Sequence, residues 1–527
     1  MKKSIFFINI IVLIISILFF SGCTNQDIKK DELVYASTKD IRNINPHLYS
    51  GEMAAQNMVF EPLVLNTNKG IQPWLAKEWQ ISNNGKTYTF YLREDVLFSN
   101  GEVFNAQVVK ENIDAILRNK TRHAWLELIN VIDSTEVIDT FTFKLNLKNA
   151  YYPTLTELSM TRPFRFLAPQ CFINNETKNS ISCYVGTGPW VLKEHKKNAF
   201  ARFERNLKYW NEKTKISSVK WRVMPDHQAI LLALQKGEID LIFGADGDMI
   251  DINAFSMLEK QNKFATKLSN PIASRAILLN TNKEFTKDLK IREALQYAID
   301  KQAIVSGILN NTETVATRLF STSIPYCNIN LENKEFNITK AKEILKNIGW
   351  QLNEKTNFLQ KDGKTLSLKL YYNISNAQEK MISEYIQSNL KTLGVDLKII
   401  GEEKQAFLNR QKSGDFDLQY SLSWGLPYDP QSFVSSWRLP THGDYQAQYG
   451  LEKKAWLDKE IKAILIEENK QVRQKKYKEI LEYIHNQSVY IPLSYSRTKA
   501  VHKTTLEGVT FNPSQYEIAF EKMYFKK

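Results

Sequence analysis

Hydrophobic and polar residues follow two different periods along this chain, and together they predict a mixed α/β fold. Three segments alternate apolar and polar residues closely enough to predict strands with one buried face. They are residues 86–95 (KTYTFYLRED), 140–148 (TFTFKLNLK) and 366–374 (LSLKLYYNI). Four other segments repeat apolar residues every three or four positions, which is the period of an amphipathic helix. They are residues 105–119, 339–349, 377–394 and 475–487.

Residues 366–400 combine a predicted strand, a predicted helix and a second strand, VDLKII (395–400). This order is typical of a βαβ unit, whose two strands are parallel and belong to one sheet. The whole chain has 527 residues, more than one hydrophobic core usually holds, so we expect two or more domains.

The first 22 residues have the pattern of a secretory leader. Lys2 and Lys3 precede an apolar run that ends in small residues before Cys23, and the run is short for a spanning helix. The ending FFSGC also resembles a bacterial lipobox, which predicts a lipoprotein signal peptide (1–22) and lipidation of Cys23. Residues 23–32 would then form a lipidated tether to the membrane. An ordinary cleaved signal with an incidental cysteine is the alternative.

The charge and the motifs of the chain exclude several classes of protein. Lysine and arginine total 70 against 57 acidic residues, a formal net charge of +13, but these charges are dispersed. No basic block suggests nucleic-acid binding, whereas a diffuse positive field favours anionic ligands. HExxH, GxSxG, phosphate-loop and CxxC motifs are absent from the sequence. We therefore predict neither an enzyme with a catalytic cofactor nor a metal site built from protein ligands alone.

Three further cysteines follow Cys23 in the sequence. Cys171 and Cys183 can pair in an oxidising compartment, which would leave Cys327 without a partner. Three buried thiols are an equal alternative, because spacing alone does not fix disulfide geometry.

Four collinear stretches carry a resemblance to a known family. They are residues 71–109, GTGPW (186–190), KYWN (208–211) and IREALQYAIDKQ (291–302). Together they resemble solute-binding protein family 5, the extracytoplasmic receptors of peptide and nickel ABC importers. The match extends over nearly all of the chain after the leader.

This resemblance implies a two-lobed periplasmic-binding-protein-like fold of type II, with mixed sheets flanked by helices and a ligand cleft between the lobes. The implied organisation is lobe I over 33–270, lobe II over 271–494 and a return to lobe I over 495–527. It also implies a non-enzymatic, monomeric receptor outside the cytoplasm that binds no nucleic acid. Its partners would be the permease and ATPase of an ABC importer.

Within the family, four pieces are similar to the nickel-binding receptors. They are residues 43–64, 122–128, 161–169 and 440–451. In that group nickel arrives inside a small chelator with carboxylates, such as free histidine. The resemblance assigns ligand binding to seven residues and metal binding to one. The ligand-binding residues are Tyr49, Met53, Arg122, Trp125, Arg162, Trp424 and Tyr428, and the metal-binding residue is His442.

The chemistry of these side chains suits a nickel chelate. A guanidinium matches a carboxylate in a bidentate, charge-assisted way, so Arg162 and secondarily Arg122 are predicted to recognise the chelator. Indole and phenol rings are rigid and flat, so Trp125, Trp424 and Tyr428 are predicted to form the walls.

His442 can complete a coordination sphere that the chelator leaves open, since neutral imidazole suits nickel. Met53 offers a soft, adaptable contact. Arg162 has a neighbour, Arg165, and one of two such arginines commonly forms a structural ion pair. Three conspicuous residues near the predicted site are expected to be structural: His123, Trp437 and Arg438.

Two other ligand classes stay open at this point. A receptor for dipeptides or oligopeptides would anchor the peptide α-amine, usually with an acidic residue, and none is among the predicted site residues. A receptor for a larger opine-type metallophore would share the tryptophans and arginines but would not need His442.

Overall fold

The computed structural model describes residues 31–244 and 249–526. The predicted leader, Cys23 and the tether up to residue 30 lie outside the described residues. Within the described ranges, no helix is long and apolar enough to cross a membrane.

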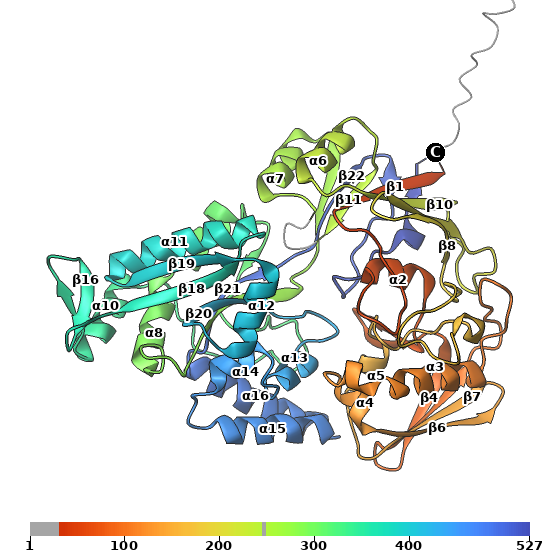
Figure 1. The fold of residues 1–527 in the computed structure, drawn as a ribbon, viewed down its shortest axis with the longest axis horizontal. Coiled ribbons are helices and arrows are strands. Elements are labelled where there is room, and N and C mark those ends of the chain that lie inside the picture. The colour runs from red at the N-terminus through yellow and green to blue at the C-terminus, as the bar shows by residue number, and fades with distance from the viewer. Residues whose placement is uncertain (1–30, 245–248, 527) are drawn as a thin grey trace, which may run out of the picture.

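A first lobe is built on a mixed seven-stranded sheet formed by the described residues (Figure 1). Its strands in spatial order are β12 (Phe264–Leu268), β22 (Lys499–Lys503), β11 (Leu241–Gly244), β1 (Glu32–Ser37), β10 (Ser218–Val223), β9 (Phe200–Arg205) and β8 (Trp190–Lys196). β1 is parallel to β10 and to β11, whereas β22 is antiparallel to both its neighbours.

The first lobe also contains a four-stranded antiparallel sheet at the lower right of Figure 1. Its strands are β4 (Ala76–Ser82), β5 (Thr87–Leu92), β7 (Thr142–Leu147) and β6 (Ile132–Asp139). The predicted strands over 86–95 and 140–148 are β5 and β7, paired with each other. The helices of this lobe are α2 (Met53–Val59), α3 (Ala106–Arg118), α4 (Glu127–Val131), α5 (Thr154–Leu158), α6 (His227–Gln235) and α7 (Ile252–Gln261).

A second lobe is built on a six-stranded mixed sheet at the left of Figure 1. Its strands are β14 (Thr314–Val315), β21 (Tyr490–Ser496), β13 (Ala273–Leu279), β20 (Leu418–Leu422), β18 (Ser367–Asn373) and β19 (Asp396–Glu402). The predicted βαβ unit is confirmed, because β18 and β19 are parallel neighbours joined through α11 (Ala377–Leu393).

The other helices of the second lobe are α8 (Leu289–Ala298), α9 (Lys301–Ala303), α10 (Ile338–Asn347), α12 (Lys404–Ser413), α13 (Gln431–Ser436), α14 (Gly443–Gln448), α15 (Lys454–Ile466) and α16 (Lys470–Asn486). The four predicted helices are α3, α10, α11 and α16. Small two- and three-stranded sheets complete the fold: β2 (Val64–Thr67) with β3 (Gly70–Pro73), β15 (Gln351–Asn353) with β16 (Phe358–Lys361) and β17 (Lys364–Thr365), and β23 (Leu506–Glu507) with β24 (Tyr524–Phe525).

Both faces of the second-lobe sheet are covered, as β13 illustrates. Successive side chains of a strand point to opposite faces. Ile277 and Leu279 join one buried apolar cluster, while Ala276 and Leu278 join another. β13 is therefore a central strand buried on both faces, and its position explains why residues 276–279 are continuously apolar and show no alternation of apolar and polar residues.

The chain passes between the lobes at two places that lie side by side. The first is the segment before β13 and the second joins β21 to β22. Backbone bonds connect them, since Ser269 N donates to Thr498 O at 3.0 Å and Ile272 N donates to Ser496 O at 2.9 Å. The return strand β22 then pairs with β11 and β12 of the first lobe.

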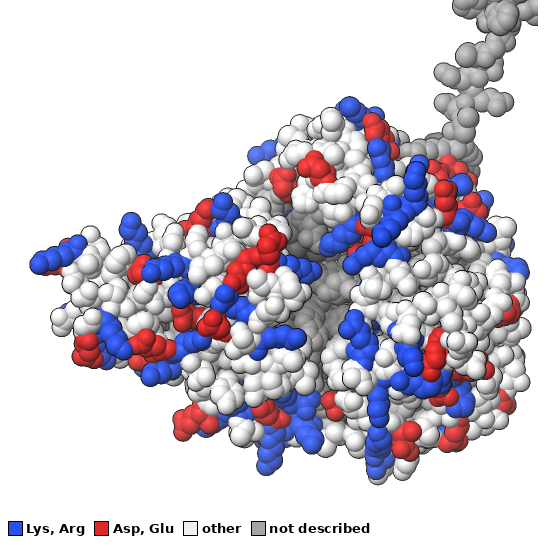
Figure 2. Space-filling view, in the orientation of Figure 1, with Lys and Arg blue, Asp and Glu red and all other residues white. Residues whose placement is uncertain are grey.

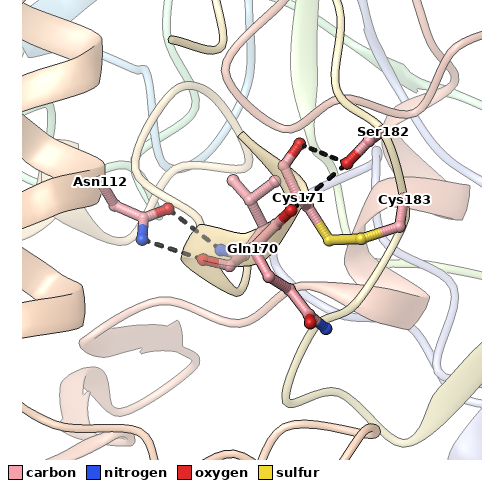
Figure 3. Close-up of a disulfide and its surroundings, with 6 residues drawn as sticks. Asn112, Gln170, Cys171, Ser182 and Cys183 are labelled. Carbon is pink, nitrogen blue, oxygen red and sulfur yellow. Dashed lines mark hydrogen bonds between the residues drawn. A yellow bond between two sulfur atoms is a disulfide. The ribbon is translucent and has the colours of Figure 1, made fainter. Parts of the chain in front are cut away.

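Cys171 and Cys183 form a disulfide in the first lobe (Figure 3). This finding decides between the two alternatives that the spacing left open. Ser182 Oγ donates to the Cys171 carbonyl oxygen at 3.1 Å inside the closed loop. Cys327 is a buried free thiol in the second lobe, and burial raises its pKa well above the usual value.

Candidate ligand-binding site

The structure brings most of the predicted site residues together at one pocket between the two lobes. The pocket has a volume of about 310 Å³, which is in the range of small-molecule sites. Figure 2 shows the hollow between the lobes, with Lys and Arg side chains on both of its rims. The pocket is lined by Tyr49, Met53, Trp125, Arg162, Trp424, Tyr428, His442 and Tyr516.

A short hydrogen-bonded chain fixes the first-lobe wall of this pocket. Trp125 Nε1 donates to the Tyr49 hydroxyl oxygen at 2.8 Å, and that hydroxyl lies 2.7 Å from Nδ1 of His123. Tyr49 therefore links Trp125 to His123, and the imidazole tautomer sets which partner donates in the bond between Tyr49 and His123. Burial, helped by the nearby Arg122 charge, lowers the pKa of His123 to about 4. The imidazole therefore stays neutral at neutral pH.

The two predicted arginines flank the same aromatic ring. The guanidinium carbon of Arg122 lies 5.2 Å from the Tyr49 ring centroid and that of Arg162 lies 6.0 Å from it. Both distances suit cation–π attraction. Arg162 lines the pocket, but Arg122 is exposed outside the pocket lining. The structure thus places Arg122 at the rim rather than in the wall.

Arg162 is held in place by the start of α2. Its Nε donates to Gln56 Oε1 at 2.7 Å and its Nη2 donates to the Gly51 carbonyl oxygen. Burial lowers the pKa of Arg162, yet an arginine remains charged. Arg165 forms the structural ion pair that was expected of one of the two arginines, because it is buried and its Nη2 lies 3.2 Å from Glu517 Oε1.

The second-lobe wall is a loop organised around one buried carboxyl. Asp429 Oδ2 accepts from Ser423 Oγ at 2.6 Å and from Gly425 N at 3.0 Å, while Oδ1 accepts from Trp424 N at 3.2 Å. Gly425 has a φ of +73°, a conformation that favours glycine. Tyr428 N donates to the Gly425 carbonyl oxygen. This compact turn sets the direction of Trp424 and Tyr428.

His442 precedes α14 and contacts the same wall. Its ring centroid lies 5.8 Å from that of Trp424. Burial lowers the pKa of His442, which keeps the imidazole neutral and able to coordinate a metal at neutral pH. In the described part of the chain, no group of three or more His, Cys, Asp or Glu side chains is arranged to hold a metal ion. A metal at His442 must therefore bring further ligands.

The walls from the two lobes touch each other. The ring of Trp125 lies 5.9 Å from that of Trp424 and 6.4 Å from that of Tyr428, between centroids. Tyr516 closes the pocket with its ring 6.0 Å from Tyr428. The sequence prediction missed Tyr516, because it lies in the irregular C-terminal return segment with no local pattern around it.

The residues that were expected to be structural lie outside the pocket lining. Trp437 is fully buried in the second-lobe core. Arg438 Nη2 lies 3.5 Å from Glu127 Oε2 of the first lobe. His123 contacts the pocket only through Tyr49.

Beyond Tyr49, Met53 and Arg162, the cleft widens into a cavity of about 740 Å³. Lys39, Arg42 and Lys404 contribute cationic side chains to its lining, against Asp40 and Glu52. The cleft as a whole is thus larger than the aromatic pocket.

Comparisons with known proteins identify the family of the chain. The family model of bacterial extracellular solute-binding proteins, family 5, matches residues 70–445. The chain belongs to this family. The chain is 41% identical over 495 residues to the nickel-binding periplasmic protein of Escherichia coli, covering 94% of both chains.

Two crystal structures show how far the similarity extends. NikA from Brucella suis in complex with Fe(III)-EDTA matches with a TM-score of 0.92 and 42% identity, over 94% of this chain and all of that one. NikZ from Campylobacter jejuni in complex with Ni(L-His) matches with a TM-score of 0.78 and 26% identity, over the same shares.

Family membership confirms two predictions. The fold class is that of the periplasmic-binding-protein-like receptors, with mixed sheets flanked by helices. The chain is a solute-binding protein and not an enzyme.

Proposed function

We propose that this chain is the extracytoplasmic receptor of an ABC importer and that it captures nickel as a small-molecule chelate. The observation that carries the proposal is the pocket itself. It combines a single imidazole, His442, with aromatic walls and one guanidinium, Arg162. One imidazole is too few ligands for a nickel ion, so a metal held there needs a chelator.

The arrangement matches the parts of such a chelate. A chelator that wraps a metal presents carboxylate oxygens outward, and Arg162 can donate hydrogen bonds to one of these carboxylates, with Arg122 at the rim. The rings of Trp125, Trp424 and Tyr428 form flat surfaces for planar ligand groups. Met53 adds a soft contact from the first turn of α2. Among the described residues that line the pocket, none is a carboxylate, which disfavours capture of a peptide α-amine.

The relatives support the same ligand class. The Escherichia coli relative is a nickel-binding protein, and the Brucella and Campylobacter relatives hold a metal together with a small chelator. Nickel with free histidine is therefore the first chelate to test, and an opine-type metallophore or a peptide is the alternative ligand.

We propose a matching cellular arrangement. The leader directs export, Cys23 is lipidated, and residues 23–32 tether the receptor to the outside of the cell membrane. The lobes, 33–270 with 495–527 and 271–494, close on the chelate as a monomer. A closed form favoured by ligand contacts from both lobes is what the permease and ATPase complex would recognise.

Native mass spectrometry tests the ligand directly. The protein is incubated with nickel alone, with nickel and free L-histidine, and with a mixture of short peptides. We expect a mass equal to protein plus nickel plus small ligand only when histidine is present. Bound peptide without metal would overturn the proposal and favour a peptide receptor.

A further inference from the structure

A second recess lies on the other side of Trp424 and His442 from the aromatic pocket. It has a volume of about 370 Å³, and Trp424 and His442 line both spaces. None of its other lining residues belongs to the aromatic pocket. The recess and the aromatic pocket therefore adjoin each other at these two side chains.

One wall of the recess is α12, and its lining residues are mostly polar. Gln405, Leu408, Asn409 and Lys412 line the recess at the spacing of one helix face. Gln405 Nε2 donates to Asn409 Oδ1 at 3.1 Å. No residue of α12 is fully buried; Phe407 packs, partly buried, against the second-lobe core, while the recess-lining face of the helix is mostly polar.

The opposite wall continues this polar character. Ser421 of β20 and Thr441, which precedes His442, contribute hydroxyls. The buried Asp444 accepts from the Tyr490 hydroxyl at 2.8 Å. Leu422 and Phe433 supply apolar surface. Amides and hydroxyls both donate and accept hydrogen bonds, so the lining suits a neutral organic group with peptide-like polarity and not a metal ion.

We propose that this recess binds a peptide-like arm of the chelator while the metal-bearing end occupies the aromatic pocket at His442. The inference rests on the proposed nickel-chelate function and extends it to the class of chelator, a histidine-headed short peptide. The arm's amide faces Gln405 and Asn409, and its terminal carboxylate is directed to the Lys412 ammonium. Such a ligand occupies both the recess and the aromatic pocket, which share His442 as a lining residue.

Two nickel complexes test the recess and the aromatic pocket separately. L-histidine with nickel places all its donors on one small molecule. L-histidylglycine keeps the amine and imidazole donors but carries its carboxylate on a glycine arm. Asn409→Trp fills the recess from an exposed helix position, and Gln405→Trp does so one turn earlier. Ala406→Trp is the matched control, because Ala406 is exposed on α12 and lines neither space.

Dissociation constants are measured by calorimetry for each protein with each complex. We expect wild type and Ala406→Trp to bind both complexes. We expect Asn409→Trp and Gln405→Trp to weaken the histidylglycine complex by about tenfold or more and the histidine complex by less than about twofold. A similar change for both complexes, or no change for either, would overturn the recess assignment.

Wild-type behaviour distinguishes this inference from the proposed function. Binding of the histidine complex without the histidylglycine complex overturns the recess assignment alone. Binding of neither complex overturns the proposed function and, with it, the recess assignment.

Discussion

His442, the proposed metal ligand, can contribute only the coordination position that the chelate leaves open. Its imidazole is half-buried beside Trp424 and stays neutral at neutral pH because burial lowers its pKa. No second His, Cys, Asp or Glu lines the aromatic pocket among the described residues. The side chain can therefore complete a coordination sphere but cannot create one.

Replacing His442 with alanine should discriminate between chelates. A nickel complex with one free coordination position loses a metal–imidazole bond, so we expect its dissociation constant to rise about tenfold or more. Nickel–EDTA, whose chelator supplies all the ligands, should change by less than about threefold. Calorimetry with both complexes measures the difference. Equal losses for the two would mean that His442 acts only as part of the wall.

His123 is the other residue whose role can be isolated. Its Nδ1 is hydrogen-bonded to the Tyr49 hydroxyl at 2.7 Å, and the side chain does not line the pocket. We predict that His123→Phe weakens chelate binding about tenfold, because Tyr49 and Trp125 lose their common orientation.

A double-mutant cycle decides whether His123 acts through Tyr49. In a Tyr49→Phe background, which already lacks the hydroxyl, His123→Phe should cost almost no further affinity. Additive losses in calorimetry would contradict a positioning role and indicate a general packing defect. The thermal midpoint of each variant serves as the control for folding.

The sequence predicted which residues line the candidate site more successfully than it predicted where each of them lies in that site. The aromatic and arginine positions came from a family resemblance over contiguous motifs. Tyr516 was missed because it lies in a segment without a motif. Arg122 lies at the rim beside the ring of Tyr49, which is 73 residues earlier in the chain. Contacts between distant segments leave no local pattern, so only the structure reveals them.

At the scale of elements, strong periodicity predicted both type and position. α11 covers 377–393 where the pattern predicted 377–394, because Asn376 caps its start and Gly394, with φ at +92°, ends it. α16 begins at Lys470, five residues before the predicted start. Its first turn is almost entirely polar and carries no apolar stripe, but Asn469 accepts from the amides of Gln471 and Val472.

The disulfide between Cys171 and Cys183 lies in the first lobe, shortly after Arg162 in the chain. In Figure 3, the Asn112 side chain of α3 holds the backbone just before the bridge, through both the amide nitrogen and the carbonyl oxygen of Leu167. Cys171 and Cys183 then close a loop with a sequence separation of 12.

Replacing both Cys171 and Cys183 with serine should lower the free energy of unfolding of the first lobe by about 3 kcal/mol, because the unfolded chain gains loop entropy. Chemical denaturation measures this free energy. Reductant should lower the denaturation midpoint of wild type to that of the double variant. Cys327→Ser, which removes the free thiol and keeps the bridge, serves as the control, and reductant should lower its midpoint as much as it lowers that of wild type. A wild-type midpoint insensitive to reductant would show that the bridge contributes nothing.

At the scale of the whole molecule, the residues proposed to bind the ligand also form contacts between the two lobes. Trp125 contacts Trp424 and Tyr428 across the cleft, and Glu127 pairs with Arg438. The chain order gave no sign of these contacts, nor of the pairing of β22 with β11 across more than 250 residues. The lobes themselves were predicted only through the family resemblance, because composition does not change where the chain passes from one sheet to the other.

A second group of contacts joins the lobes away from the aromatic pocket. The Tyr152 hydroxyl of the first lobe lies 2.6 Å from that of Tyr477 in α16, and Tyr152 N donates to the Leu465 carbonyl oxygen at 3.2 Å. The guanidinium carbon of Arg473 lies 4.3 Å from the Tyr152 ring centroid. If the lobes separate, water replaces each hydroxyl as the hydrogen-bond partner of the other.

Tyr152→Phe should therefore shift the molecule toward the open form. In the closed form it leaves the buried Tyr477 hydroxyl without its partner, at a cost of about 1 kcal/mol, whereas water solvates that hydroxyl when the cleft opens. We expect the dissociation constant of the nickel–histidine complex to rise about three- to tenfold and the radius of gyration in solution scattering to increase without ligand. Tyr88→Phe is the matched control, because its hydroxyl bonds within the first lobe, to the Tyr151 carbonyl oxygen. If Tyr152→Phe and Tyr88→Phe change affinity and scattering equally, the tyrosine pair does not contribute to closure.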